Sequence, residues 1–298
     1  MNKTLGTIFI VIVLGVVLYI QQAKKFIPDG SKLEQISEAY SFTEGPAVDS
    51  DGNVYFTDQP NNQILKWSID GTISVFMDSC GRSNGLYFDN KGNLLACADE
   101  HNQIWSINVK TKEVNVLVDQ FNGLTLNGPN DLWSDSKGGI YFTDPFYKRE
   151  YWTDSSRVAM KENVYYLSPN RVSIVVVDSN LVKPNGIIGT TEGRILYVSD
   201  IGAGRTYSYH MNDDGTLSNR RLFCKMGSDG MTIDDKGNVY LTNKGVTVFN
   251  LKGEQIAHID IDEEWTANVT LGGPERNILF ITAMNSVYTF RLNVKGTR

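Results

Sequence analysis

Six polar residues stand at equivalent places in a phrase that this chain repeats six times. Each copy opens with an acid or an amide, continues through an apolar stretch and a turn, and ends in a β-rich run. The openers are Glu44, Asn84, Asn130, Asn185, Asp229 and Asn268. Carboxylate and amide oxygens are hard donors, which suit calcium best and magnesium or manganese less well. If the fold gathers these side chains, they could bind a divalent cation.

The openers recur about every 40 to 55 residues, a spacing typical of propellers, solenoids and arrays. Turns such as Asp51-Gly52 suit tight hairpins, and runs such as 54–57 favour a pleated sheet. Weaker strands between the copies, as at 63–69 and 72–76, bring each unit to about four strands, which fits a propeller blade. We therefore predict an all-β, six-bladed β-propeller over residues 26–298. A chance series of turns in an open sandwich would not keep its order and phase through six copies.

In a propeller the first strand of each blade lines the channel, so we expect the six openers to converge at one mouth. Unsatisfied polar groups would be costly there, and a bound cation would satisfy them. Glu44 and Asp229 supply two negative charges, which neutralise a divalent ion. The set contains no histidine or cysteine, which disfavours a dedicated zinc site. The alternative, that openers cap strands or bind channel water, carries most weight for Asn84 and Asn268.

Composition limits the partners and the compartment. A net charge of −6 without a basic cluster argues against a nucleic-acid partner. Residues 5–20 form an almost unbroken apolar run, which predicts a hydrophobic N-terminal helix acting as signal-anchor or signal peptide over residues 1–25. The protein is then exported, either membrane-anchored through this segment or periplasmic or extracellular. Three cysteines make no disulfide framework, so we expect buried thiols, although Cys80 and Cys97 could pair.

Several motifs, in order and spacing, resemble the senescence marker protein/gluconolactonase/luciferin-regenerating-enzyme family of six-bladed propellers. The resemblance covers about Phe42 to Phe290 and is closest to bacterial gluconolactonases, notably at Tyr141-Phe-Thr-Asp-Pro. The motifs are Glu44-Gly-Pro, Gly128-Pro-Asn-Asp-Leu, Lys183-Pro-Asn-Gly, Ser228-Asp-Gly-Met and Ala267-Asn-Val-Thr-Leu-Gly-Gly.

The resemblance implies a catalytic divalent metal, usually calcium, with Mg²⁺, Mn²⁺ or Zn²⁺ as alternatives. The residues that match its ligands are Glu44, Asn130, Asn185 and Asp229. It also implies hydrolysis of lactones or, in related branches, of organophosphates. We expect the ion to act as a Lewis acid on the ring carbonyl, and Asp229 to act as general base or as nucleophile. Glu44 would mainly hold the ion.

Two glycines depart from relatives. Gly128 stands where some sugar-lactone hydrolases carry an arginine near the substrate, which puts sugar-acid specificity in doubt. Gly230 stands where paraoxonase-like enzymes add an amide ligand, which argues against that branch.

Further candidates surround the predicted mouth. Asn84, Asn268 and His101 are candidate substrate contacts, although a surface-loop position suits His101 better. The insertion Pro145 to Glu162 carries Tyr147, Tyr151 and Trp152 and is either a lid over the mouth or an exposed aromatic loop.

We predict a metal-dependent lactonase that hydrolyses a sugar or small aliphatic lactone at the mouth of the channel. The main rival is a non-catalytic propeller that binds a peptide or glycan while a metal stiffens its channel. A strictosidine-synthase-like propeller is a third reading, which the gluconolactonase motifs disfavour. Glu44 and Asp229 are both present, which favours the enzyme. The sequence contains no Gly-x-Ser-x-Gly elbow and no nucleotide-binding fingerprint.

Overall fold

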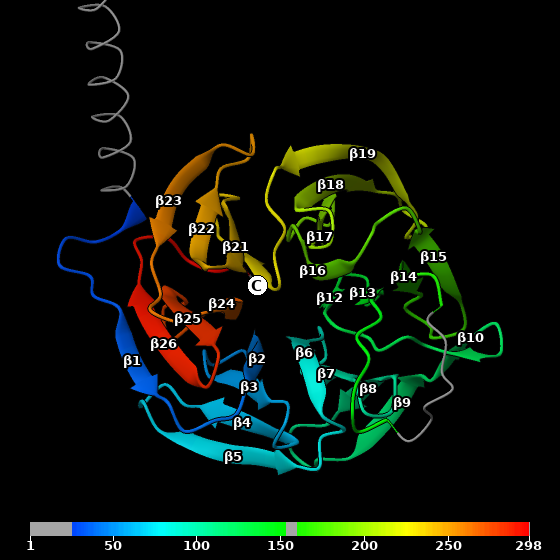
Figure 1. Ribbon diagram of the computed structural model, residues 1–298, viewed down its shortest axis with the longest axis horizontal. Helices are drawn as coiled ribbons and strands as arrows, with labels where there is room; N and C mark the ends of the chain where they lie inside the picture. The colour runs from blue at the N-terminus through cyan, green and yellow to red at the C-terminus, as the bar shows by residue number, and fades with distance from the viewer. Residues whose placement is uncertain (1–25, 153–159, 298) are drawn as a thin grey trace, which may run out of the picture.

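Six four-stranded antiparallel sheets surround a central channel like the blades of a propeller (Figure 1). The computed structural model describes residues 26–152 and 160–297. Every helix or strand element in these residues is a strand, which confirms the predicted all-β six-bladed propeller. The predicted N-terminal helix and signal segment lie outside the described residues. Within the described ranges, no helix is long and apolar enough to cross a membrane.

Each blade runs from an innermost strand at the channel to an outermost strand at the rim. Blade 1 contains β2 (Thr43–Val48), β3 (Val54–Asp58), β4 (Gln63–Trp67) and β5 (Ile73–Asp78), and blade 2 contains β6 (Ser83–Phe88), β7 (Leu94–Ala98), β8 (Gln103–Ile107) and β9 (Val114–Val118). Blade 3 contains β12 (Leu132–Ser134), β13 (Ile140–Asp144), β14 (Asn163–Leu167) and β15 (Ile174–Asp178), and blade 4 contains β16 (Pro184–Gly189), β17 (Ile195–Asp200), β18 (Arg205–Met211) and β19 (Leu217–Cys224). Blade 5 contains β20 (Met231–Ile233), β21 (Val239–Asn243), β22 (Gly245–Phe249) and β23 (Gln255–Ile259). A small hairpin of β10 (Gln120–Phe121) and β11 (Leu124–Thr125) precedes blade 3.

Blade 6 joins the two ends of the chain and closes the ring. It contains β24 (Thr266–Gly272), β25 (Ile278–Ala283) and β26 (Ser286–Arg291), and its outermost strand is β1 (Glu34–Ser37). The strand β1 pairs antiparallel with β26, with Glu34 opposite Thr289. The repeated phrase predicts no strand at residues 34–37.

Removal of residues 1–38 should therefore destabilise the propeller, because β26 would lose its outer partner strand and Ile36 would leave the blade 1–blade 6 core. We expect the melting temperature to fall by roughly 5–10 °C. The matched control removes only residues 1–24, which keeps β1 and the buried Phe26. Equal melting temperatures of the two truncations in scanning calorimetry would contradict this role of β1.

The apolar core lies between neighbouring blades. Every residue of β3 and of β13 is buried, because both faces of an inner strand pack on adjacent blades. The largest fully buried side chains are tyrosines and phenylalanines of these inner strands, among them Tyr141 and Tyr240. All three cysteines are buried and free, as expected, so packing stabilises the fold without a disulfide. This rigid ring fixes the positions of the residues at the channel.

Candidate functional site

All six openers lie at one end of the channel, which we call the opener end. Each lies within two residues of the first residue of the innermost strand of its blade. Neighbouring openers lie very close together. The residue that follows the opener in blades 1, 2 and 4 is therefore a glycine, because a larger residue would not fit there. A Cβ on Gly45 would lie 2.1 Å from the backbone oxygen of Asn84, one on Gly85 2.6 Å from that of Asn130, and one on Gly186 2.6 Å from that of Asp229. Asn268 Nδ2 donates to Glu44 Oε2 at 3.4 Å, so the openers form a closed ring.

Buried threonines of the second strands hold this ring in place. Thr57 Oγ1 donates to the backbone oxygen of Asn84 at 3.1 Å, Thr242 Oγ1 accepts from the Gly230 amide at 2.9 Å, and Thr282 Oγ1 accepts from the Asn268 amide at 3.0 Å. Water has little access to these bonds because all three threonines are fully buried. In blades 1, 5 and 6 the threonine near the end of the β-rich run thus fixes the backbone at an opener or at the residue after it.

Three carboxylates share the opener end. Glu44 is 2% exposed and Asp131 is 6% exposed, whereas Asp229 is half-buried. Burial raises the pKa of Glu44 well above its usual value, and the negative charges of Asp229 and Asp131 raise it further. Burial also raises the pKa of Asp131 to about 8, although its carboxylate accepts backbone hydrogen bonds from Leu132 and Ile187. Like charges buried together resist ionisation, so a cation would stabilise this cluster.

The amide of Asn185 presents an oxygen that lacks a partner. Its side chain is 1% exposed, and Nδ2 donates to the hydroxyl of Tyr147 at 3.1 Å. Oδ1 is buried and has no hydrogen-bond partner among the described residues. An unsatisfied buried polar atom costs about 1–3 kcal/mol, which a bound cation would offset.

Asp229 lies beside Asn185 and is held by an indole. Trp265 Nε1 donates to Asp229 Oδ2 at 2.6 Å. Burial raises the pKa of Asp229 to about 6, while the hydrogen bonds from Trp265 and Asn185 oppose that rise. Sequence reasoning missed both Trp265 and Asp131. An acid directly after the opener Asn130 was the available signal for Asp131, and the sequence offered none for Trp265.

The acidic side chains at the opener end do not by themselves form a complete set of metal ligands. Within residues 26–152 and 160–297, no three His, Cys, Asp or Glu side chains are grouped as a metal site. Any cation at the opener end must therefore also draw on amide oxygens. Asn130, which is 5% exposed, and Asn185 are the predicted amide ligands, and the ring of openers gathers them with Glu44 and Asp229.

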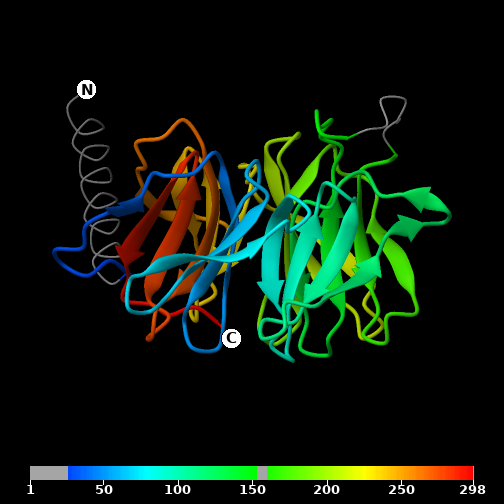
Figure 2. The same ribbon diagram turned by 90° about the horizontal axis from the view of Figure 1, so that it is seen from below.

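The described part of the insertion packs over the opener end. In the side view its residues rise at the end opposite the C-terminus (Figure 2). Tyr147 contacts Asn185, Tyr151 donates to Asp99 Oδ2 at 2.7 Å, and Trp152 Nε1 donates to the Asp99 backbone oxygen at 3.1 Å. These aromatic side chains are therefore not an exposed loop. Residues 153–159 of the insertion lie outside the described residues.

Asp99 accepts hydrogen bonds from other donors than the aspartates at the equivalent positions of blades 1, 3 and 4. Asp58, Asp144 and Asp200 end the second strands and accept hydrogen bonds from backbone amides of the loop before their opener. Asp99 instead accepts from Arg149 Nε at 2.7 Å, as well as from Tyr151. The carboxylate of blade 2 thus anchors the insertion.

The remaining predicted contacts differ in their placement. Asn84 is 5% exposed within the ring of openers, and Asn268 lies against Gly230, where a Cβ would come 1.9 Å from its Cγ. His101 is exposed and stacks on Trp105 with ring centroids 5.5 Å apart. No contact between His101 and an opener is found in the part of the chain that the structure describes. The geometry therefore favours the surface-loop position for His101 over a substrate contact.

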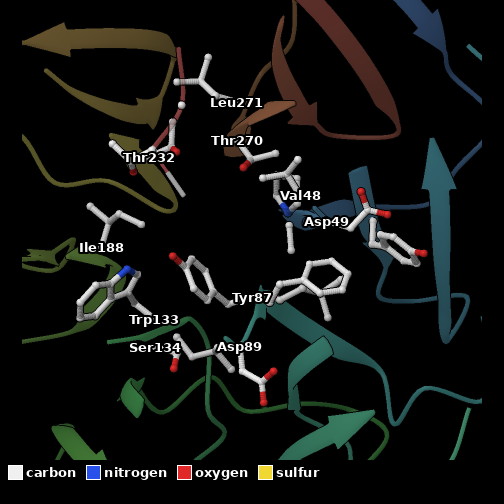
Figure 3. Close-up of a pocket in the computed structure, with 18 of the residues that line it drawn as sticks. Val48, Asp49, Tyr87, Asp89, Trp133, Ser134, Ile188, Thr232, Thr270 and Leu271 are labelled. Carbon is white, nitrogen blue, oxygen red and sulfur yellow. The ribbon is translucent and has the colours of Figure 1, made fainter. Parts of the chain in front are cut away.

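A cavity of about 810 Å³ lies at the other end of the channel, which we call the hairpin end. Figure 3 shows Tyr87 projecting into it beside Trp133, with Ile188 and Leu271 on its wall. Asp131 and Asn268 line this cavity too, so it reaches the inner side of the opener ring. The sequence pattern gave no indication of this cavity. Its lining is mixed and lacks Glu44, Asn185 and Asp229.

Comparison with known proteins shows the family of this chain. A family model described as SMP-30/Gluconolactonase/LRE-like region matches residues 42–285. The chain belongs to this family. Within the SMP-30/Gluconolactonase/LRE-like family, a gluconolactonase of Zymomonas mobilis is 27% identical over 293 residues, which cover 89% of this chain and 82% of that protein. The family resemblance predicted from the repeated motifs is therefore confirmed.

Two further members show how far the similarity extends. Lactonase drp35 of Staphylococcus haemolyticus is 27% identical over 251 residues, which cover 76% of this chain and 71% of that protein. The solved structure of a gluconolactonase from Xanthomonas campestris is 26% identical with a TM-score of 0.83, and the match covers 91% of this chain and 92% of that one. The family similarity thus extends over most of the propeller.

If the opener end binds calcium, the substitution Tyr147→Phe should weaken that binding while leaving the fold intact. Its hydroxyl orients the Asn185 amide, and loss of such an outer partner of a metal ligand typically costs 10–100-fold in affinity or activity. We expect about a 10-fold loss of calcium affinity in isothermal titration calorimetry. Tyr207→Phe is the matched control, because Tyr207 packs under Arg220 on the strand β18. Unchanged calcium affinity in Tyr147→Phe would show that the hydroxyl does not support Asn185.

Proposed function

We propose that this lactone-hydrolysing enzyme is metal-dependent and acts on a sugar or small aliphatic lactone at the opener end. The reaction class rests on its gluconolactonase and lactonase relatives. The observation that carries the metal dependence is the unpartnered, buried Asn185 Oδ1 in the same ring as mutually repelling carboxylates. Buried polar atoms in native proteins nearly always have a partner, and a bound cation would be the partner of Asn185 Oδ1.

The residues at the opener end fit a calcium ion. Glu44 and Asp229 would supply carboxylate oxygens, and Asn130 and Asn185 would supply amide oxygens, a hard set without nitrogen or sulfur. When bound, a divalent cation supplies Lewis-acid polarisation of the lactone carbonyl and stabilises the developing oxyanion.

Glu44 and Asp229 differ in ways that suit different tasks. Glu44 is buried and its carboxylate accepts from the Gly45 amide at 2.8 Å, so it suits a fixed ligand. Asp229 is half-buried, which allows a water molecule to reach it, and Trp265 fixes its orientation. A pKa raised to about 6 lies near neutral pH, where a general base is most effective. We assign Asp229 as the base that takes a proton from the attacking water, with direct attack on the carbonyl carbon as its alternative.

The test is lactone hydrolysis by a soluble fragment that retains Phe26, assayed with calcium and with a chelator. The panel contains glucono-1,5-lactone and small aliphatic lactones. We expect turnover that depends on calcium and returns when calcium is restored after chelation. Turnover that persists fully in chelator would contradict metal dependence. A folded, metal-bound protein that hydrolyses none of these lactones would favour the non-catalytic propeller.

We also propose that residues 1–25 direct export and, if uncleaved, anchor the propeller to a membrane. The apolar run at residues 5–20 supports this proposal. Cell fractionation of the full chain tests it, because retention in the cytosolic fraction would contradict export.

A further inference from the structure

The guanidinium of Arg149 lies at the opener end and uses only part of its hydrogen-bonding capacity. Its Nε donates to Asp99 Oδ2 at 2.7 Å. Among the described residues this is the one hydrogen bond found for the guanidinium, so both Nη atoms remain available. The side chain is 26% exposed, which leaves the outer edge of the guanidinium open to solvent.

Two interactions place Arg149 beside the proposed reaction centre. Its Cζ lies 5.4 Å from the ring centroid of Tyr147, whose hydroxyl accepts from Asn185. Its positive charge also acts on the carboxylate of Asp229. One aromatic side chain therefore separates this guanidinium from a predicted metal ligand.

Asp99 holds Arg149 in this position before any substrate binds. The Asp99 side chain is 3% exposed, and its Oδ2 also accepts from Tyr151 at 2.7 Å and from Gln59 Nε2 at 3.0 Å. A guanidinium fixed at Nε loses little further conformational freedom when its two Nη atoms bind a ligand. The neighbouring Lys183 is more fully engaged, because its Nζ lies 4.5 Å from the Tyr147 ring centroid and donates to the backbone oxygen of Phe146 at 3.5 Å.

A cationic side chain at position 128 would not fit at this part of the opener end. A Cβ there would lie 2.8 Å from Asp99 Oδ1 and 3.3 Å from Trp152 Cζ2. The space beside Gly128 is thus filled by the group that anchors Arg149 and by the insertion itself. A positive charge on this side of the mouth comes from the insertion.

We propose that Arg149 determines substrate specificity by binding an anionic substituent of the lactone, so that the enzyme prefers carboxylate-bearing lactones over neutral ones. A planar guanidinium with two free Nη atoms matches the two oxygens of a carboxylate. The inference deepens the proposed lactonase function and rests on it. It names the substrate class as the lactone of a sugar diacid or of a similar acid.

The test compares D-glucaro-1,4-lactone, which carries a free carboxylate, with D-glucono-1,4-lactone, which carries a hydroxymethyl group at that place. In wild-type protein with calcium we expect a higher kcat/KM for the glucarolactone. Arg149→Gln should lower kcat/KM for the glucarolactone about 10- to 100-fold, the usual scale for a lost hydrogen bond to a charged group, and change the neutral lactone little. Arg149→Lys should restore part of the preference, because it keeps the charge but loses the fork.

The control is Arg194→Gln, which removes an equal charge at an exposed turn of the hairpin end. The preference should survive in this variant and weaken with added salt in the wild type. An equal fall with both lactones in Arg149→Gln would show that Arg149 only supports the insertion, and would overturn the inference. If the wild type turns over neither lactone, the proposed function fails, and calorimetric binding of the two unhydrolysed lactones tests Arg149 by itself. Loss of a preference for the glucarolactone in Arg149→Gln supports the role, and equal affinities of the wild type for the two lactones overturn it.

Discussion

Asp229→Asn is expected to reduce lactone turnover by about 10²–10⁴-fold at saturating calcium, the range for loss of a general base. The substitution preserves shape, and the amide oxygen of asparagine can still accept from Trp265 Nε1. The fold should survive and even gain stability when a chelator is present, because one of three mutually repelling carboxylates is removed. Steady-state kinetics and thermal melting of the same preparation separate lost chemistry from lost structure.

The control for this variant is Asp213→Asn, which removes the same charge from the surface. Asp213 is exposed and pairs with Lys137 at 2.9 Å, so the pair contributes little to stability. Its activity and melting temperature should match the wild type. Activity of Asp229→Asn within about 3-fold of the wild type, with calcium still bound, would exclude Asp229 as the base, since a lost base costs at least 10²-fold. A single turnover in ¹⁸O-labelled water distinguishes base from nucleophile, because direct attack transfers a carboxylate oxygen of Asp229 to the first product.

Periodicity explains why the sequence predicted the ring of openers. Residues at one phase of a repeated strand must lie at one height in a closed propeller, so Glu44, Asn185 and Asp229 could be brought together without knowledge of any loop. The buried Thr57, Thr242 and Thr282, which hold the backbone near the openers, stand at one phase of the same repeat. Closure by β1 had no such signal, because residues 34–37 form a short strand that pairs with a strand at the far end of the sequence.

Loop paths explain what the sequence did not predict. Trp265 lies before the innermost strand of blade 6 and reaches Asp229 of blade 5, a contact outside the repeat. Asp99 and Asp58 occupy the same phase, yet one anchors an insertion and the other a backbone loop. Arg149 lies in the insertion, outside the repeated phrase. Residues in repeats could be placed by symmetry, whereas those in the insertion required the structure.

With a chelator present, the propeller should lose stability as the pH rises from about 4 to about 8. Burial raises the pKa of Asp131 to about 8 and that of Asp229 to about 6, and it raises the pKa of Glu44 as well. The unfolded carboxyl groups titrate near pH 4, so across this window the folded state binds more protons than the unfolded state. The free energy of unfolding therefore decreases as the pH increases. We expect the melting temperature to fall by on the order of 5–10 °C between these two pH values.

Calcium should remove most of this pH dependence, because a bound divalent ion compensates the charges that protons otherwise neutralise. At a free concentration 100 times its Kd, a ligand of the folded state adds about 2.7 kcal/mol of stability, so the gain from calcium should be largest near pH 8. Asp131→Asn is the diagnostic variant, because it removes the carboxylate raised to about 8 and should flatten the upper part of the curve measured with chelator. Parallel melting curves with calcium and with chelator across the whole pH range would show that the buried carboxylates and the cation are not coupled. That result would leave the clustered charges of Glu44, Asp131 and Asp229 to be stabilised by protons alone, and it would argue against a metal at the opener end.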